Sequence, residues 1–410
     1  MRARNQVNGI SVHAISGTRA VLLAMDATPE ARRRLLGFAI KVRRRAEATE
    51  HWLHGFKFFR ELTPSSQPGG RRSTLEHPIQ SFLWGHYSVE PDQGYEYTIR
   101  PVLRPDSGNL SQLEFGRDVT VTIRTQGVNQ GVYSVFFNRG ALVSQTYASR
   151  FGNHPLPPHP DDPEDAATVW LSRDLLRAVL DFIEQARNAR FSLRAAVHEF
   201  SYVPVLNAFS EAAARGADVR IIYAAGSERK AGGAISLTST ARVNEAAIEQ
   251  LSFDRSLLIP RTQCPDIPHN KFVILLENDH AVAVWTGSTN FTRAGFLGQT
   301  NVGHIVRDES VARAFPDYWQ KLSTDPDDEI IKDWVMANNP HPRGSMAPNA
   351  IVPIFSPRRN TRMMNWYGEH LEAANQMVLL TAPFGVTRRL AEYLDNNRDF
   401  LRCLLIERQA

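Results

Sequence analysis

Helix-like and strand-like patterns alternate in the second half of this sequence, and that alternation limits the possible folds more than any other feature. From residue 169 onward, segments of helical spacing and of strand character follow one another at residues 175–189, 193–197, 203–215 and 219–223. Strands that alternate with helices are typical of an α/β fold, with one sheet covered by helices on both faces. The apolar run at residues 272–276 fits that fold, because a strand buried on both faces shows no polar alternation.

Polar groups stand at the start of this apolar run. His269 and Lys271 precede it, and because strand side chains alternate, the two should project from one side, about 7 Å apart. A second apolar run, residues 281–285, leads into a Gly-Ser-Thr-Asn turn, so a hairpin would bring Ser288 and Asn290 beside the first pair. An imidazole, an amine, a hydroxyl and an amide would then converge. That set suits a phosphoryl group better than a metal ion.

Together, the two motifs resemble the half-site of the phospholipase D superfamily, His-x-Lys-x4-Asp followed by Gly-Ser-x-Asn. The matching residues are His269, Lys271, Gly287, Ser288 and Asn290. The resemblance extends in order and spacing across about residues 169–322. It departs from the family at Leu276, which stands at the aspartate position, with Glu277 and Asp279 as the nearest acids. In the family this aspartate mainly supports the site, so Glu277 is one candidate supporting residue.

The resemblance implies a two-step cleavage of a phosphodiester. His269 would attack phosphorus, or act as the general acid, and water would then release a phosphohistidine. Lys271, Ser288 and Asn290 would stabilise the oxygens on which charge develops, with no metal ion or other cofactor. A second histidine must protonate the leaving alkoxide. The sequence offers no second motif, so His269 of a partner chain is expected to supply it, which predicts a homodimer.

A second candidate supporting residue follows the strand at residues 193–197. His198 and Glu199 stand at its C-terminal end, where ligands bind in α/β sheets. Glu199 could therefore orient His269.

The sequence up to about residue 151 is mostly β in character. Alternating or strand-rich segments at residues 94–100, 119–124 and 132–137 predict a small antiparallel sandwich-like domain over residues 1–153. Residues 31–45 are predicted to form a helix with a basic, solvated face. The Pro-rich residues 154–165 read as a stiff linker, followed by the phospholipase D-like half-domain at residues 166–325.

The C-terminal part contains a second copy of the opening of this half-domain. Residues 371–406 repeat the order helix end, strand, bend, helix and strand found at residues 183–223. We therefore expect a partial second half at residues 350–410, without its own His-x-Lys. Either two chains must pair, or the chain is a truncated product.

Composition places few further limits on function. The chain has 410 residues, of which 42% are hydrophobic and 22% charged, and a net charge of +4, which permits a phosphate-bearing partner without requiring one. Only six of its cations are lysines, against 41 arginines, so a lysine in the motif hints that a compact ammonium is needed there. Two cysteines provide neither a disulfide framework nor zinc spacing. No apolar stretch approaches the length of a transmembrane segment, so a cytoplasmic protein is expected.

Three functions remain open. A phospholipid hydrolase is the first choice, with Phe291, Phe296 and Leu297 as an apolar entrance. A metal-independent DNA nuclease of the same superfamily is the second, and its basic groove would include Arg293, Arg229 and Lys230. The third is a non-catalytic binding module, since the second half-site is missing.

Overall fold

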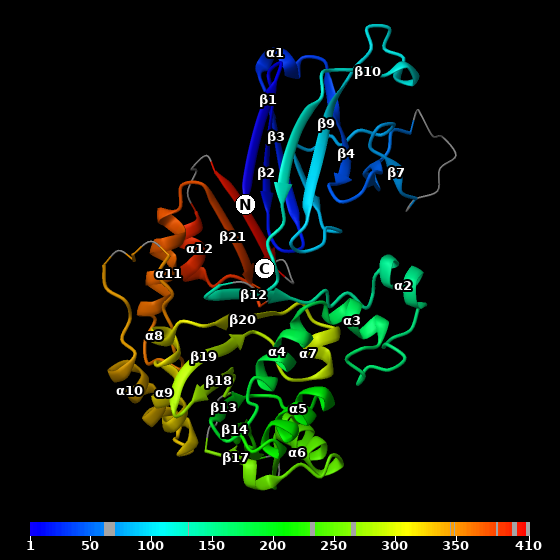
Figure 1. Cartoon of the computed structure of the whole chain (residues 1–410). Coiled ribbons are helices and arrows are strands. Elements are labelled where there is room, and N and C mark those ends of the chain that lie inside the picture. The colour runs from blue at the N-terminus through cyan, green and yellow to red at the C-terminus, as the bar shows by residue number, and fades with distance from the viewer. Residues whose placement is uncertain are drawn as a thin grey trace. The chain divides into compact units, whose positions relative to one another are not determined.

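The computed structural model describes the whole chain except residues 61–69, 130, 230–233, 264–267, 345, 348, 383, 396–399 and 407–410 (Figure 1). The chain divides into two compact units, Met1–Gln130 and Gly131–Ala410. Both contain β-sheets, but only in the second do strands alternate with long helices. Within the described residues, every helix is too short or too polar to span a bilayer.

Two larger antiparallel sheets and one small two-stranded pair form the described part of the first unit. One has the order β1-β2-β3-β8, with β1 (Arg2–Val7), β2 (Ile10–Ser16), β3 (Val21–Ala27) and β8 (Leu83–His86). The other has the order β10-β9-β4-β5, with β11 also beside β9: β4 (Leu35–Arg44), β5 (Glu50–Trp52), β9 (Gly94–Leu103), β10 (Glu114–Phe115) and β11 (Val119–Arg124). The short elements are α1 (Pro29–Arg32), β6 (His54–Gly55), β7 (Arg72–Ser73) and the 3-10 turn η1 (Leu110–Gln112).

Side chains from both sheets build one apolar core. Every second residue of β2 and of β11 is buried, as expected for strands with one face inward. Both strands contribute to the same cluster of buried residues. The β-rich N-terminal region predicted from the sequence is therefore present, while its closer description as a sandwich stays a prediction.

The prediction of a helix at residues 31–45 is wrong, because most of this segment forms strand β4. Ile40 and Val42 face the core with the period of a strand. Lys41 and Arg43 alternate with them and pair with carboxylates on the neighbouring strands β5 and β9. Cross-strand ion pairs, rather than solvent on a helix face, therefore satisfy these cations.

A seven-stranded mixed sheet organises the second unit, in the order β12-β20-β19-β18-β13-β14-β17. Its strands are β12 (Tyr133–Phe137), β13 (Phe191–Val197), β14 (Asp218–Ala224), β17 (Leu258–Arg261), β18 (Lys271–Glu277), β19 (His280–Gly287) and β20 (Val302–Val306). The pairs β13–β14 and β14–β17 are parallel, and all other pairs are antiparallel. The mixed sheet of the predicted α/β fold is thus confirmed.

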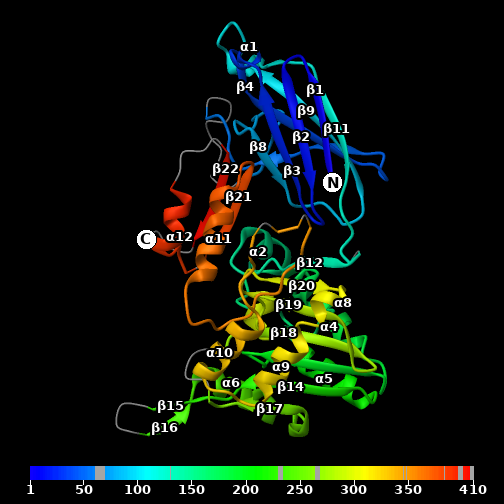
Figure 2. The same cartoon turned by 90° about the vertical axis from the view of Figure 1, so that its left-hand side faces the viewer.

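Helices cover both faces of this sheet (Figures 1 and 2). α4 (Leu175–Glu184) and α5 (Val203–Ala214) lie on one face, and α8 (Glu309–Ala312) and α9 (Phe315–Ser323) lie on the other. On the α9 side, β18 and β19 share one core with α9 and α10 (Asp328–Asn338). Trp319 Nε1 of α9 donates to the carbonyl oxygen of Ala195 in β13 at 2.8 Å. The other elements before residue 300 are α2 (Gln145–Phe151), α3 (Ala166–Ser172), β15 (Ser227–Arg229), β16 (Ile235–Leu237), α6 (Ser239–Gln250), η2 (Arg255–Leu257) and α7 (Arg293–Leu297).

The domain boundary predicted at residue 153 lies inside the second unit and is corrected to residue 130. Strand β12 was expected in the N-terminal domain, but it pairs with β20 at the edge of the second sheet. The Pro-rich residues also pack against this unit: Tyr202 donates to the carbonyl oxygen of Pro160 at 2.7 Å, and Arg293 pairs with Asp161. Local composition could predict neither the pairing of β12 nor the contacts of the Pro-rich residues, because their partners lie far away in the sequence.

The C-terminal part repeats the order of β13, α5 and β14. Helix α11 (Arg362–Ala373) precedes β21 (Met377–Ala382), and α12 (Arg388–Leu394) connects it to the parallel strand β22 (Leu401–Ile406). This is the arrangement expected for residues 350–410, whose identity as a second half stays a prediction. The start of that range packs elsewhere, because Phe355 lies in the core beside α9 and Arg359 pairs with carboxylates of α10.

Candidate functional site

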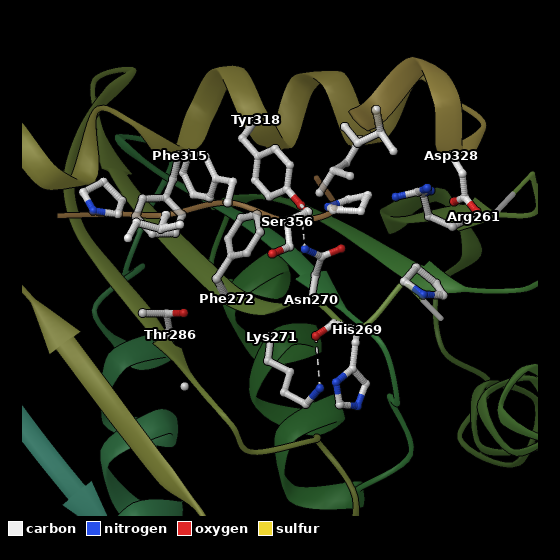
Figure 3. Close-up of a pocket in the computed structure, with 18 of the residues that line it drawn as sticks. Arg261, His269, Asn270, Lys271, Phe272, Thr286, Phe315, Tyr318, Asp328 and Ser356 are labelled. Carbon is white, nitrogen blue, oxygen red and sulfur yellow. Dashed lines mark hydrogen bonds between the residues drawn. The ribbon is translucent and has the colours of Figure 1, made fainter. Parts of the chain in front are cut away.

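Strand β18 carries the first predicted motif at its N-terminal end. It pairs with β13 on one side and β19 on the other, so the start of the strand is held from both sides. The side chains of His269 and Lys271 point to the same side of the strand, whereas Asn270 and Phe272 point to the opposite side (Figure 3). The two groups predicted to share one side therefore do so.

The Lys271 amine is nearly dry. The residue is 6% exposed, and its Nζ donates to the carbonyl oxygen of His269 at 3.1 Å. Burial lowers the pKa of the Lys271 amine to about 8, and the Glu199 carboxylate offsets part of that effect. At pH 7 the amine still holds its proton. A desolvated cation of this kind gains more from a bound anion than one already hydrated by water.

The His269 ring is exposed to solvent, unlike the neighbouring amine. Partial burial, followed by the Lys271 cation, lowers the pKa of the imidazole below its ordinary value. The neutral ring therefore prevails at pH 7. Only that form has a ring nitrogen with a lone pair available for attack on an electrophile.

The hydroxyl group of Ser288 holds the Gly-Ser-Thr-Asn turn in place. Ser288 Oγ donates to Asn301 Oδ1 at 3.0 Å and accepts from the Val302 N–H at 3.1 Å. Its proton is thus committed to the turn, which argues against the phosphate-binding role predicted for it. Asn290 differs, since its Oδ1 is buried with no hydrogen-bond partner in the part of the chain that the structure describes.

Backbone hydrogen bonds tie this turn to the end of β13. The N–H of Phe291 donates to the carbonyl oxygen of Glu199 at 3.2 Å, and the N–H groups of Ser201 and Tyr202 donate to the Phe291 carbonyl at 2.9 Å each. The first residue of β18, Lys271, is itself opposite Val197, the last residue of β13. The C-terminal ends of β13 and β19 and the N-terminal end of β18 therefore meet at the predicted site residues.

The two candidate supporting residues have different outcomes. Glu199 lies close enough to Lys271 for its charge to act on the amine. Glu277 is at the far end of β18, about 20 Å along the strand, and pairs with Arg190. It cannot touch the site, so its assignment as a supporting residue is corrected. Leu276, at the family's aspartate position, is buried in the core on the α9 side of the sheet.

The structure adds a histidine that the sequence did not assign to the site. The rings of His198 and His269 lie 4.9 Å apart between centroids, with an interplanar angle of 69°. His198 is 8% exposed. The signal was its place at the end of a strand, but the contact depends on the pairing of β13 with β18, which local sequence does not specify.

A cavity of about 460 Å³ lies beside the start of β18 (Figure 3). His269 and Lys271 border it, but their side chains point away from its aromatic wall, which includes Phe315 and Tyr318. Across it, Asn270 Nδ2 donates to the Tyr318 hydroxyl at 2.9 Å, and that hydroxyl donates to the Ser356 carbonyl oxygen at 2.6 Å. This chain of hydrogen bonds fixes the residue between the two motif positions.

The residues proposed to distinguish lipid from nucleic acid are mostly engaged elsewhere. The predicted apolar entrance, Phe291, Phe296 and Leu297, is buried, and the two phenylalanine rings stack on each other. Of the predicted basic groove, Arg293 remains partly exposed beside the turn although it pairs with Asp161, and Arg229 is exposed on β15. Lys230 lies outside the described residues.

Comparisons with known proteins point to one family. Residues 182–323 match the family described as "Cardiolipin synthase, PLD-like domain". That segment contains His269, Lys271, the turn ending at Asn290 and His198. No curated protein matches the chain at a significant level.

Solved structures give weaker similarities. The phospholipase D family member Nuc from Salmonella typhimurium is 28% identical over 35% of this chain and 84% of its own, with a TM-score of 0.28. NucT from Helicobacter pylori is 19% identical over 38% and 90%, with a TM-score of 0.29. Polyphosphate kinase from Porphyromonas gingivalis is 11% identical over 58% and 39%, with a TM-score of 0.35. These TM-scores are too low to support a conclusion of their own.

Proposed function

Residues 182–323 form a domain of the phospholipase D superfamily, and from that premise we propose that this chain is a phosphodiester hydrolase. One observation carries the proposal. An exposed imidazole with a lowered pKa, His269, projects from the same side of β18 as a buried cation, Lys271. The imidazole can attack phosphorus, and the cation can bind the phosphoryl oxygens beside it.

The proposed reaction has two steps. A ring nitrogen of His269 attacks phosphorus, so that an N–P bond forms while the P–O bond to the leaving group breaks and a general acid protonates the departing oxygen. Water then attacks the phosphohistidine and gives a proton to the same group, and the N–P bond breaks. Lys271 and the Asn290 side chain would stabilise the phosphoryl oxygens in both steps.

None of the residues placed around His269 above is assigned as the general acid that protonates the departing oxygen. We retain the hypothesis that His269 of a second copy of the chain serves, in a homodimer that completes the site. A strict monomer with full hydrolytic activity would contradict it, and size-exclusion chromatography with light scattering measures the state of assembly. The C-terminal α11–β22 segment repeats the opening of the half-domain but brings no His-x-Lys of its own.

For the substrate class, we now favour a nucleic-acid phosphodiester over a phospholipid. The lipid choice depended on three apolar residues near the turn, and all three are buried in the core. Polar or basic groups stay accessible at the motif and its turn, namely His269, Ser288 and Arg293. A basic, polar surface suits a polyanionic backbone better than an acyl chain.

The test of hydrolysis uses bis-p-nitrophenyl phosphate with EDTA present. We expect turnover by the wild-type chain and a loss of at least about a thousandfold in His269→Asn. His304→Asn is the matched control, because His304 is a partly buried histidine stacked on Tyr133 elsewhere in the same sheet. Equal rates for wild type and His269→Asn would overturn the proposal and favour the binding module.

The substrate class is tested separately. Plasmid DNA and phosphatidylcholine vesicles are incubated with the same protein, and cleavage of each is followed over time. We expect nicking of the plasmid that His269→Asn abolishes, and little release of headgroup from the vesicles. The reverse pattern would restore the phospholipid assignment.

A further inference from the structure

His198 is held in place by the backbone on two sides. Its N–H donates to the carbonyl oxygen of Asn270 at 2.9 Å, and its own carbonyl oxygen accepts from Asn244 Nδ2 at 3.0 Å. Asn244 is completely buried and also donates to the carbonyl oxygen of Ala224. The His198 ring therefore projects from a rigid point next to the motif strand.

The ring of His198 makes an edge contact with the ring of His269. A centroid separation of 4.9 Å at 69° is the geometry of an aromatic pair in van der Waals contact. An in-line acid must lie across the phosphorus atom from the nucleophile, and two rings in contact leave no room for a phosphoryl group between them. This geometry excludes His198 as the acid that protonates the leaving group.

The groups around His198 disfavour a positive charge on its ring. Burial, then the neighbouring His269 and Lys271, lower the pKa of His198 to about 4, so the ring is neutral at pH 7. Glu199 is the acidic neighbour, and its charge acts on Lys271. The Nδ1 atom of His198 is buried without a hydrogen-bond partner among the described residues, which fits a ring retained for its packing.

We propose that His198 is a positioning residue for His269, acting through the packing of its ring and not through proton transfer. The contact fixes the orientation of an otherwise exposed side chain and keeps water from one of its faces. Less hydration makes the cationic form of His269 less stable, which keeps the attacking nitrogen unprotonated. This inference rests on the proposed function, since it assigns a purpose to the orientation of the nucleophile.

The experiment compares His198→Phe, which keeps an aromatic ring, with His198→Ala, which removes it. Carbethoxylation of His269 by diethyl pyrocarbonate, followed by peptide mass spectrometry across a pH series, reports the pKa of this ring without any need for activity. We expect His198→Ala to raise the pKa of His269 by roughly half a unit towards its ordinary value, and His198→Phe to leave it nearly unchanged. His304→Phe is the matched control and should leave it unchanged.

Hydrolysis of bis-p-nitrophenyl phosphate supplies the second readout. We expect kcat to fall about tenfold in His198→Ala and to recover to within about threefold of wild type in His198→Phe. An unchanged His269 pKa in His198→Ala, or a His198→Phe variant as impaired as His198→Ala, would overturn the inference. A wild type without hydrolytic activity, but with the expected pKa change in His198→Ala, would instead overturn the proposed function alone.

A measurement on the wild type covers the case in which His198→Ala does not fold. With histidine rings isotopically labelled, His198 and His269 are assigned by the His198→Phe and His269→Asn variants. Nuclear Overhauser effects between the two rings are expected at this separation. Their absence would overturn the inference whatever the variants do.

Discussion

Lys41 on β4 and Lys271 on β18 both stand on inner strands, but their surroundings are opposite. The Lys41 amine pairs with the Glu50 carboxylate at 2.5 Å and lies over the ring of Trp52. Lys271 is more deeply buried, forms no ion pair with any described residue, and donates to a neutral carbonyl. A cation with a carboxylate partner supports its sheet. A buried cation without one weakens the fold and remains available to an anion from outside.

The largest expected effect comes from removing each lysine in turn. Lys271→Met should reduce hydrolysis by about a hundredfold or more, because a donor to the phosphoryl oxygens is lost. The same change should raise the free energy of unfolding at pH 7 by about 1–3 kcal/mol, because the folded state no longer holds a buried cation. Activity on bis-p-nitrophenyl phosphate and urea unfolding measure the two effects.

Lys41→Met is the matched variant for this comparison. It should leave hydrolysis unchanged and lower the free energy of unfolding by less than about 1 kcal/mol, as for a partly exposed ion pair. If both variants lost stability alike, the contrast between the two lysines would fail.

The next effect concerns acid stability, again compared between the two units. The pKa values of His86 and His198 are each lowered to about 4, mainly by burial. In the unfolded chain both rings titrate near the ordinary value of about 6.5. Below that pH the unfolded state binds more protons than the folded state. The contribution of each neutral, buried ring to the free energy of unfolding is therefore complete above pH 6.5 and is lost as the pH falls towards 4. The loss is up to about 3 kcal/mol per histidine.

His86→Phe and His198→Phe should each remove the part of the acid-induced loss of stability that comes from the replaced histidine. Urea unfolding midpoints at pH 7, 5.5 and 4.5 would measure this change. The two variants should differ at pH 7. His86 Nδ1 lies 2.9 Å from the Tyr97 hydroxyl, whereas His198 Nδ1 has no described partner. His86→Phe should therefore cost about 1 kcal/mol more than His198→Phe. Equal costs would show that the two rings are held in the same way.

The smallest expected effect concerns two buried tyrosines of the second unit. Tyr318→Phe breaks the hydrogen bonds to Asn270 and Ser356 and should cost about 1–2 kcal/mol. Tyr147→Phe should cost nothing measurable, because its buried hydroxyl has no partner in the part of the chain that the structure describes. Urea unfolding of the two variants measures the difference, and a loss as large in Tyr147→Phe would contradict it.

What the sequence predicted was local in origin. His269 and Lys271 share a side because they are two residues apart on one strand, and the α/β order follows from periodicity. What it missed depends on distant pairing. β12 joined the second sheet through β20, and His198 reached His269 only because β13 lies beside β18. The helix predicted at residues 31–45 failed because the carboxylates that pair with its cations stand on other strands.

The contacts of Phe355 and Ser356 determine where a fragment of this protein can end without disturbing the motif. The carbonyl oxygen of Ser356 is the last acceptor in the chain of hydrogen bonds that begins at Asn270, and Phe355 beside it stacks on Tyr318 with ring centroids 4.3 Å apart. A fragment ended before Phe355 would uncover an aromatic surface on α9 and release the middle residue of the motif. A fragment carried through Arg359 keeps that brace and its anchors on α10.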